Sequence, residues 1–381
     1  MAIASNENES NSTTRFESER KISNDFQEQL ETKQPGIRLH ISIYTDELIE
    51  QELNVQTNSG LGPDLIIANS NLTLNLLASG LTDPIPLTKE REQLINRGAL
   101  QRVKTTSGLI AGQPVSQYLQ LACFDKRKLD AAPATLKELS IASSKNKVFG
   151  MVTDFDHLYW SIGGFGAGEA LATSLRGQKT SMAAHKRLTE WLRWLKASSY
   201  QQNIVFLQNQ SALRRALIQG EMSWISCWSS QLPQLREALK EHLGIAPLPS
   251  GNFGRATPIT RLQVWSLGKN SSKRQREESL KLLNFIMQPW AQKTYALKYK
   301  TNYPVNPAAS MIIGKQLPFA FTNYDEAESK RVSRGDAIIA AIQSKPSLSD
   351  DIQSTLNALI FDGLSPEQAA TELETKLKAK R

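Results

Sequence analysis

The chain has 381 residues, more than one hydrophobic core usually serves, because cores stop growing at about 250–300 residues. Hydrophobic residues make up 40% and charged residues 22%, as in ordinary globular proteins, and no apolar run approaches the ~20 residues of a membrane span. The formal net charge is +8, but basic residues alternate with acids in segments such as "TKEREQLINRG". This pattern indicates solvated faces and argues against a nucleic-acid-binding stripe.

The amino terminus and the cysteine content bear on the cellular compartment. The first residues, "MAIASNENESNSTTRF", lack the charged start, apolar middle and cleavage site of a secretory signal. The protein is therefore either cytoplasmic or a mature form that begins with an added Met. Cys123 and Cys227 are too few for a disulfide scaffold. Simple packing is favoured for both, and one bridge in an oxidising compartment stays open.

The first third of the chain predicts alternating strands and helices. Leu39, Ile41 and Ile43 alternate as in a strand after a Pro-Gly turn, and apolar residues recur at helical spacing before that turn. The predicted elements are a strand at 2–5, a helix at 14–32, a strand near 37–44, a helix at 46–56, a strand at 65–68 and a helix closed by Gly80. Such a series predicts a mainly parallel sheet with helices on its faces.

The stretch "GPDLIIANSNLTLNLL" holds the first candidate site. Its strand is apolar throughout, which is typical of a parallel sheet covered on both sides. The strand ends in Asn69, Ser70 and Asn71, and ligands of open α/β sheets bind at the carboxyl ends of strands. Capping of the next helix explains any one of them. Three together leave polar groups for a ligand.

The rest of the chain continues the alternation and ends in helices. The predicted strands include 117–124, the segments "KVFGM" and "WISCW", and two in "LGIAPLPSGNFGRATPITRLQVWSLGK". The predicted helices are "TLKELSIAS", 181–197, 211–219, 273–287, 289–298, "DAIIAAIQ", "SLSDDIQSTLNALIFDG" and "SPEQAATELETKLKAK". The last begins with a capping signature at Ser365 and Pro366. An α/β fold class follows.

The order of several segments resembles a known family. The segments are "GPDLIIAN" with "ASGLTDPIPL", "GQPVSQYLQLACFDKRKL", "APATLKEL", "ALIQGEMSWISCWSSQL", "GIAPLPSG" and "SLKLLNFIMQPWAQKTYALKYKTNYPVNPAA". In this order and spacing they resemble the extracellular solute-binding proteins of ABC importers, in the branch that includes maltose-binding protein. The match covers nearly all of residues 36–310.

The resemblance implies two α/β lobes, each a mainly parallel sheet flanked by helices, joined by crossing hinge strands. The lobes of such proteins close on a solute in the cleft. The strand at 117–124, with a polar entry and a long apolar body, suits a crossing strand. The expected division is an N-terminal lobe of 1–118, a C-terminal lobe of 119–266, a return to the first lobe at 267–320, and helices at 321–381 that pack on the lobes.

The resemblance also implies the function. We expect an exported receptor, periplasmic or attached to the cell surface, that delivers a small-molecule carbohydrate to the ABC transporter permease subunits in the membrane. A monomer without cofactor or nucleic-acid partner is expected. The favoured solute is a disaccharide or a glucosylated osmolyte such as glucosylglycerol, trehalose or sucrose. A polyamine, whose site also combines aromatic rings with acids, stays open, as does a glycerol phosphodiester.

The candidate ligand-binding residues are polar or aromatic, because carboxylates and amides bind sugar hydroxyls while aromatic rings stack on sugar faces. For the Tyr and Trp of "TDFDHLYW", core packing is an equal alternative. Asp156 is a possible helix cap and Arg261 a possible solvated charge. The expected set is Asn69, Ser70, Asn71, Gln117, Asp154, Asp156, Tyr159, Trp160, Trp228, Arg261 and Tyr303.

Catalysis is not expected. Asp154 and Asp156 resemble the paired carboxylates of a glycosidase, but two aspartates separated by one residue on a turn usually diverge. The "GFGAG" segment lacks the setting and the Lys-Ser/Thr of a phosphate loop. The histidines, at positions 40, 157, 185 and 242, lack metal-ligand spacing. No catalytic residue, metal or cofactor is therefore predicted.

Overall fold

The structure, a computed structural model, describes residues 1–5, 24, 27–28, 30–32, 39–45, 48–314 and 326–379. Most of the predicted helix at 14–32 and the Pro-Gly turn after it lie outside the described residues; Leu30, which is described, is helical and fully buried. The chain forms two compact units. Unit 1 comprises Met1–Tyr118 and Arg261–Ala320, and unit 2 comprises Leu119–Thr260 and Phe321–Arg381.

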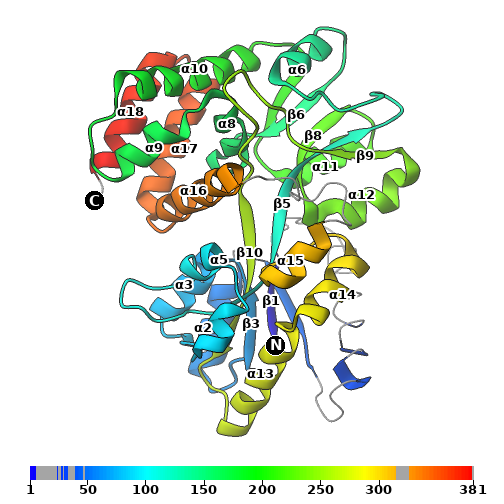
Figure 1. Cartoon of the computed structure of the whole chain (residues 1–381), viewed down its shortest axis with the longest axis vertical. Coiled ribbons are helices and arrows are strands. Elements are labelled where there is room, and N and C mark those ends of the chain that lie inside the picture. The colour runs from blue at the N-terminus through cyan, green and yellow to red at the C-terminus, as the bar shows by residue number, and fades with distance from the viewer. Residues whose placement is uncertain are drawn as a thin grey trace. The chain divides into compact units, whose positions relative to one another are not determined.

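The sheet of unit 1 is mixed. Strand β1 (Ala2–Ser5) pairs in parallel with β2 (Ser42–Thr45) and β3 (Leu65–Ala68). Strand β10 (Thr260–Gly268) runs antiparallel to β3 and also pairs with β4 (Thr82–Asp83). The named helices of the unit are α2 (Ile49–Asn58), α3 (Ser70–Ala78), α4 (Lys89–Gln93), α5 (Arg97–Gln101), α13 (Lys273–Ile286), α14 (Pro289–Tyr299) and α15 (Pro307–Gly314). Figure 1 labels β1, β3, β10 and these helices except α4.

Strand β3 is buried on both faces, as its apolar sequence predicts. Leu65 and Ile67 belong to a core cluster that includes Leu282 of α13. Ile66 and Ala68 point to the other face, into a cluster formed with α2 and α3. Because side chains alternate along a strand, one short apolar run supplies both cores.

Unit 2 has a second mixed sheet. Strand β5 (Gln113–Asp125) begins in unit 1 and continues into unit 2, where it pairs antiparallel with β8 (Trp224–Trp228) and β9 (Leu243–Ala246). Strand β6 (Phe149–Val152) lies parallel to β8 and to β7 (Ile204–Leu207). The helices between these strands are α6 (Leu136–Ser143), α7 (Phe155–Leu158), α8 (Ile162–Phe165), α9 (Gly168–Leu175), α10 (Met182–Ser199), α11 (Gln210–Ile218) and α12 (Leu232–Leu239).

The carboxyl-terminal helices belong to unit 2. They are α16 (Glu326–Gln343), α17 (Pro346–Ile360) and α18 (Pro366–Ala379). Helix α18, red in Figure 1, packs against α9, α10 and α17. The predicted cap at its start is present, because the Ser365 hydroxyl accepts a hydrogen bond from the Gln368 main-chain N–H at 3.2 Å.

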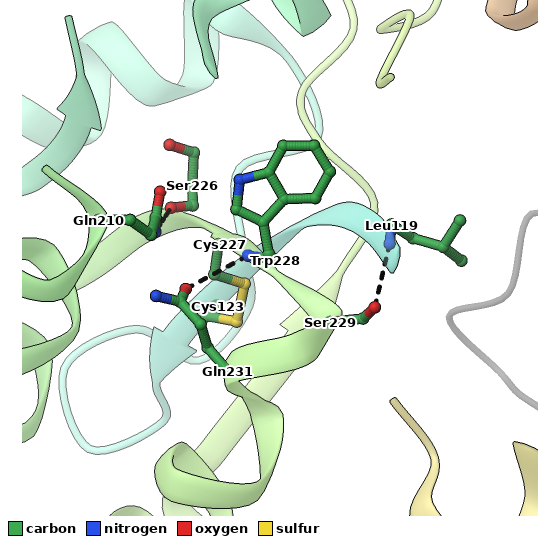
Figure 2. Close-up of a disulfide and its surroundings, with 8 residues drawn as sticks. All are labelled: Leu119, Cys123, Gln210, Ser226, Cys227, Trp228, Ser229 and Gln231. Carbon is green, nitrogen blue, oxygen red and sulfur yellow. Dashed lines mark hydrogen bonds between the residues drawn. A yellow bond between two sulfur atoms is a disulfide. The ribbon is translucent and has the colours of Figure 1, made fainter. Parts of the chain in front are cut away.

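The two cysteines form a disulfide, so the favoured interpretation of simple packing was wrong. Cys123 lies on β5 and Cys227 on β8, both buried, with their Cα atoms 5.9 Å apart (Figure 2). The strand register explains the bond: Leu121 is opposite Cys227, so the cysteines are diagonal neighbours on one face. This Cα separation lies in the usual range for disulfides. A sequence separation of 104 hides such a pair from local patterns.

Candidate functional site

The short helix α7 follows β6 and carries two of the predicted aspartates. Asp154 stands at the N-cap position, but its side chain makes no capping hydrogen bond to the helix. Asp156 lies inside the first turn of α7 and is therefore not the N-cap residue, which was one of the alternatives considered for it. Both aspartates are partly exposed, whereas Phe155 between them is buried. The buried Phe155 side chain therefore holds this turn against the core of unit 2, while the two carboxylates on either side of it are partly exposed.

His157, the next residue of α7, is held in one orientation by Gln210. The Gln210 Nε2 donates to the main-chain oxygen of Ser226 at 2.6 Å (Figure 2), which leaves its Oε1 3.0 Å from Nδ1 of His157. Because that oxygen only accepts, Nδ1 carries the hydrogen. The other ring nitrogen, Nε2, then lies 3.9 Å from the Asp156 carboxylate.

Trp228, at the end of β8, completes this part of the structure. Its ring meets the His157 ring edge to face, with the centroids 5.8 Å apart and the planes at 86°. Its main-chain N–H donates to Oε1 of Gln231 at 3.3 Å (Figure 2). We call Asp154, Asp156, His157, Gln210 and Trp228 the α7–β8 group. It joins two acids, an imidazole, an amide and an indole within unit 2.

Tyr159 and Trp160 lie apart from this group, in the core of unit 2. Trp160 is fully buried and packs against Trp224 and Trp194 at centroid distances of 6.4 Å. Tyr159 is buried beside Phe155, and burial raises the pKa of its hydroxyl. Their positions agree with the packing alternative. A ligand contact by either remains a prediction.

In unit 1, the polar residues after β3 begin α3. The Asn69 Oδ1 accepts a hydrogen bond from the Leu72 N–H at 3.0 Å and thereby caps the helix. Ser70 is buried and Asn71 is partly exposed. The capping alternative therefore describes one of the three.

Three further predicted residues of unit 1 lie on strands. Gln117 of β5 is the antiparallel partner of Tyr303 of β11 (Tyr303–Pro304). The Tyr303 hydroxyl donates to the Ser310 main-chain oxygen at 3.3 Å, and burial raises its pKa. Arg261 lies near the start of β10, ahead of Val264, which is opposite Ala68. Arg261 therefore belongs to the part of β10 that extends past the Asn69 end of β3.

Sequence reasoning missed His157 and Gln210. Among the described residues, Asp154, Asp156 and His157 are the one group of three whose ligand atoms all lie within 4.8 Å of one another, a spacing that permits a cation. The adjacency of Asp156 and His157 in "TDFDHLYW" offered a local signal for the histidine. Gln210 had none, because it comes from a distant helix. Trp228 and His157 are buried, so the group presents mainly the partly exposed carboxylates of Asp154 and Asp156, which accept hydrogen bonds.

The described helices include none long and apolar enough to cross a membrane. No curated protein sequence matched the chain.

Several solved structures resemble the chain. The GacH receptor of Streptomyces glaucescens, solved unliganded and with acarbose, aligns with 100% of this chain and 98% of its own at 13% identity and a TM-score of 0.72. The maltose/maltodextrin-binding domain MalE of Bdellovibrio bacteriovorus, solved with maltotriose, aligns with 99% and 98% at 16% identity and a TM-score of 0.70.

These similarities show the fold: this chain has the two-lobed α/β architecture of periplasmic binding proteins, as the sequence analysis predicted. The family itself is shown by a sequence model. The model of the bacterial extracellular solute-binding proteins matches residues 21–316, which is most of the chain. The chain therefore belongs to the bacterial extracellular solute-binding proteins, which are binding receptors and not enzymes, as predicted.

Proposed function

We propose that this protein captures a neutral carbohydrate outside the cytoplasm and delivers it to the permease subunits of an ABC importer. The α7–β8 group carries the proposal. A pyranose presents a rim of hydroxyls, which suits the partly exposed carboxylates of Asp154 and Asp156, and an apolar C–H face, which suits an indole. Trp228 is 2% exposed in this structure, so stacking on its ring requires a movement that uncovers it. His157, whose ring touches that of Trp228, adds a polar contact at the same place.

The solved relatives support the carbohydrate class. Their structures contain acarbose in one case and maltotriose in another. Within that class we propose a disaccharide or a glucosylated osmolyte such as glucosylglycerol, trehalose or sucrose. This choice rests on polar residues outnumbering aromatic ones in the candidate set.

Unit 1 supplies a second set of candidate contacts. These are Asn69, Ser70, Asn71, Gln117, Arg261 and Tyr303, which lie at the end of β3 and on strands β5, β10 and β11. Amide, hydroxyl and guanidinium groups suit sugar hydroxyls. We propose these residues as the solute contacts of unit 1.

The proposed location is the periplasm or the cell surface. Disulfides persist in oxidising compartments, so the Cys123–Cys227 bond supports an exported protein. The proposed working form is a monomer.

A polyamine is the second candidate solute. Two carboxylates beside an indole also suit an organic cation, which gains ion pairs from the acids and a cation–π contact from the ring. The same group therefore supports both classes, and measured binding must separate them.

Isothermal titration calorimetry tests the proposal directly. The purified protein is titrated with maltose, trehalose, sucrose, glucosylglycerol, glycerophosphoglycerol and spermidine. We expect micromolar or tighter binding of one neutral sugar, lost on Trp228→Ala and weakened at least tenfold by Asp154→Asn. Asp362→Asn is the control, because Asp362 is exposed beyond α17 and is not a member of the α7–β8 group. Binding of spermidine alone would replace the sugar, and turnover of any sugar would refute a receptor.

A further inference from the structure

Gln120 of β5 connects three main-chain groups through one buried amide. Its Nε2 donates to the carbonyl oxygens of Asp156 at 3.2 Å and of His157 at 3.4 Å. Its Oε1 accepts from the Ile259 N–H at 3.0 Å. The residue is 4% exposed. Because an amide is planar and rigid, groups on its two ends cannot shift independently while these hydrogen bonds hold.

Gln120 also stands beside Trp228. The two residues are directly opposite in the β5–β8 register, so their side chains share a face of the sheet. The same strands are joined on the opposite face by the disulfide, because side chains alternate along a strand. In addition, the Ser229 hydroxyl accepts from the Leu119 N–H at 3.0 Å (Figure 2). Strands β5 and β8, which carry Gln120 and Trp228, are thus joined by side-chain contacts in addition to their main-chain pairing.

The third contact of Gln120 leads to β10. Ile259 is buried and directly precedes Thr260, which is the last residue of the first segment of unit 2 and the first residue of β10. Thr260 is in turn held by Asp336 of α16. From Arg261 onward β10 belongs to unit 1. The amide of Gln120 therefore links α7 to the residues from which the chain leaves unit 2.

We propose that Gln120 is a positioning residue that couples solute engagement at α7 to the start of β10. A solute that draws on Asp156 or His157 displaces the α7 main chain, and the amide passes this displacement to the Ile259 N–H. By linkage, the position of β10 then changes the affinity for solute by the same factor. This inference rests on the proposed function and names the residue that joins recognition to hinge motion.

A matched residue separates coupling from ordinary structural support. Gln113 lies on the same strand, is 1% exposed, and its Nε2 donates to the Leu283 carbonyl oxygen at 2.9 Å within unit 1. Gln120→Met removes three buried side-chain-to-main-chain hydrogen bonds from β5 and Gln113→Met removes one, so both variants test the loss of a buried amide. A merely structural role predicts lower stability in both variants and unchanged solute affinity in both.

The experiment combines calorimetry with amide hydrogen exchange. In wild type, the sugar that binds most tightly among maltose, trehalose, sucrose and glucosylglycerol should slow exchange of the Ile259 amide. Gln120→Met should bind that sugar at least tenfold more weakly, and the sugar should no longer change Ile259 exchange. Gln113→Met should bind within twofold of wild type. The proposal is overturned if Gln120→Met binds the sugar as tightly as wild type does. It is also overturned if the sugar does not change the exchange rate of the Ile259 amide in wild type.

A second measurement keeps the proposal separate from the sugar assignment. If none of these sugars binds to wild type, the proposed function fails, and coupling is then decided in solute-free protein. His157→Ala should speed Ile259 exchange at least fivefold in the wild-type background and add nothing in the Gln120→Met background. Equal effects in both backgrounds refute coupling. Gln120→Glu, which when ionised keeps an acceptor for Ile259 but has no donor for the α7 carbonyls, replaces Gln120→Met if that variant does not fold, with exchange measured at a pH at which this carboxyl group is ionised.

Discussion

Asp336 of α16 accepts two hydrogen bonds from one residue, Thr260. The Thr260 N–H donates to Oδ1 at 2.7 Å and its hydroxyl donates to Oδ2 at 2.6 Å. A helix that lies late in the sequence thus fixes the residue at which β10 begins. Hydrogen bonds to a charged group contribute more than neutral ones, so this contact attaches α16 firmly to unit 2.

We therefore expect Asp336→Ala to lower the free energy of unfolding by about 2 kcal/mol. Asp336→Asn keeps one carbonyl acceptor and should lose roughly half of that amount. Urea unfolding followed by circular dichroism provides the measurement. Asp362→Ala, at an exposed position, should leave the midpoint unchanged, and an equal loss in that control would contradict a specific role for Asp336.

The disulfide should stabilise unit 2 by restricting its unfolded chain. The bond closes a loop with a sequence separation of 104, and loops of this size correspond to roughly 3–5 kcal/mol in chain-entropy estimates. Replacing both Cys123 and Cys227 by Ala should therefore lower the urea midpoint. Wild type unfolded in a phosphine reductant should match the double variant. A midpoint insensitive to reductant would show that the bond contributes little to stability.

Unit 1 has a carboxylate whose ionisation stabilises the fold. Asp83 of β4 is partly buried, which by itself raises its pKa, but hydrogen bonds from Lys269 and Arg276 outweigh burial and hold the pKa below the usual value of an aspartate. A carboxyl with a depressed folded-state pKa stabilises the protein above its unfolded pKa. That contribution is lost as the pH falls through the lower, folded-state value.

Asp83→Asn should therefore destabilise the protein at pH 7 by about 1 kcal/mol, and the difference from wild type should shrink below pH ~3.8. Urea midpoints of both proteins between pH 7 and pH 2.5 test this. A difference that stays constant over the whole range would mean that the charge of Asp83 does not contribute.

Local patterns predicted the elements whose burial is decided by their own sequence. The apolar run at 65–68 forms β3 with the predicted bounds, because four consecutive apolar residues between polar ends suit a strand covered on both faces. The helix predicted at 181–197 is α10 (Met182–Ser199), whose buried stripe includes Leu188, Leu192 and Leu195.

Long-range pairs were beyond this reasoning. The Cys123–Cys227 bond and the Gln210–His157 contact depend on strand register and on which helix end meets which loop. The aromatic residues of "TDFDHLYW" show a related difficulty. Packing and ligand stacking demand the same side chains, so only the fold reveals that Tyr159, Trp160 and Trp228 are all buried and that the Trp228 ring packs against His157.

Asn69 permits a last test, because its two possible roles need different atoms. Its Oδ1 caps α3, whereas a sugar hydroxyl can also use the amide as a donor. Asn69→Asp keeps a capping oxygen but removes the donor, so we expect unchanged or slightly higher stability and at least fivefold weaker sugar binding. Asn69→Ala should lose about 1 kcal/mol of stability as well. Asn96, which caps α5 in the same unit, is the matched control: Asn96→Asp should change neither quantity. If both Asp variants bind sugar as wild type does, Asn69 is a helix cap and not a ligand contact, and the unit 1 set then loses its first member.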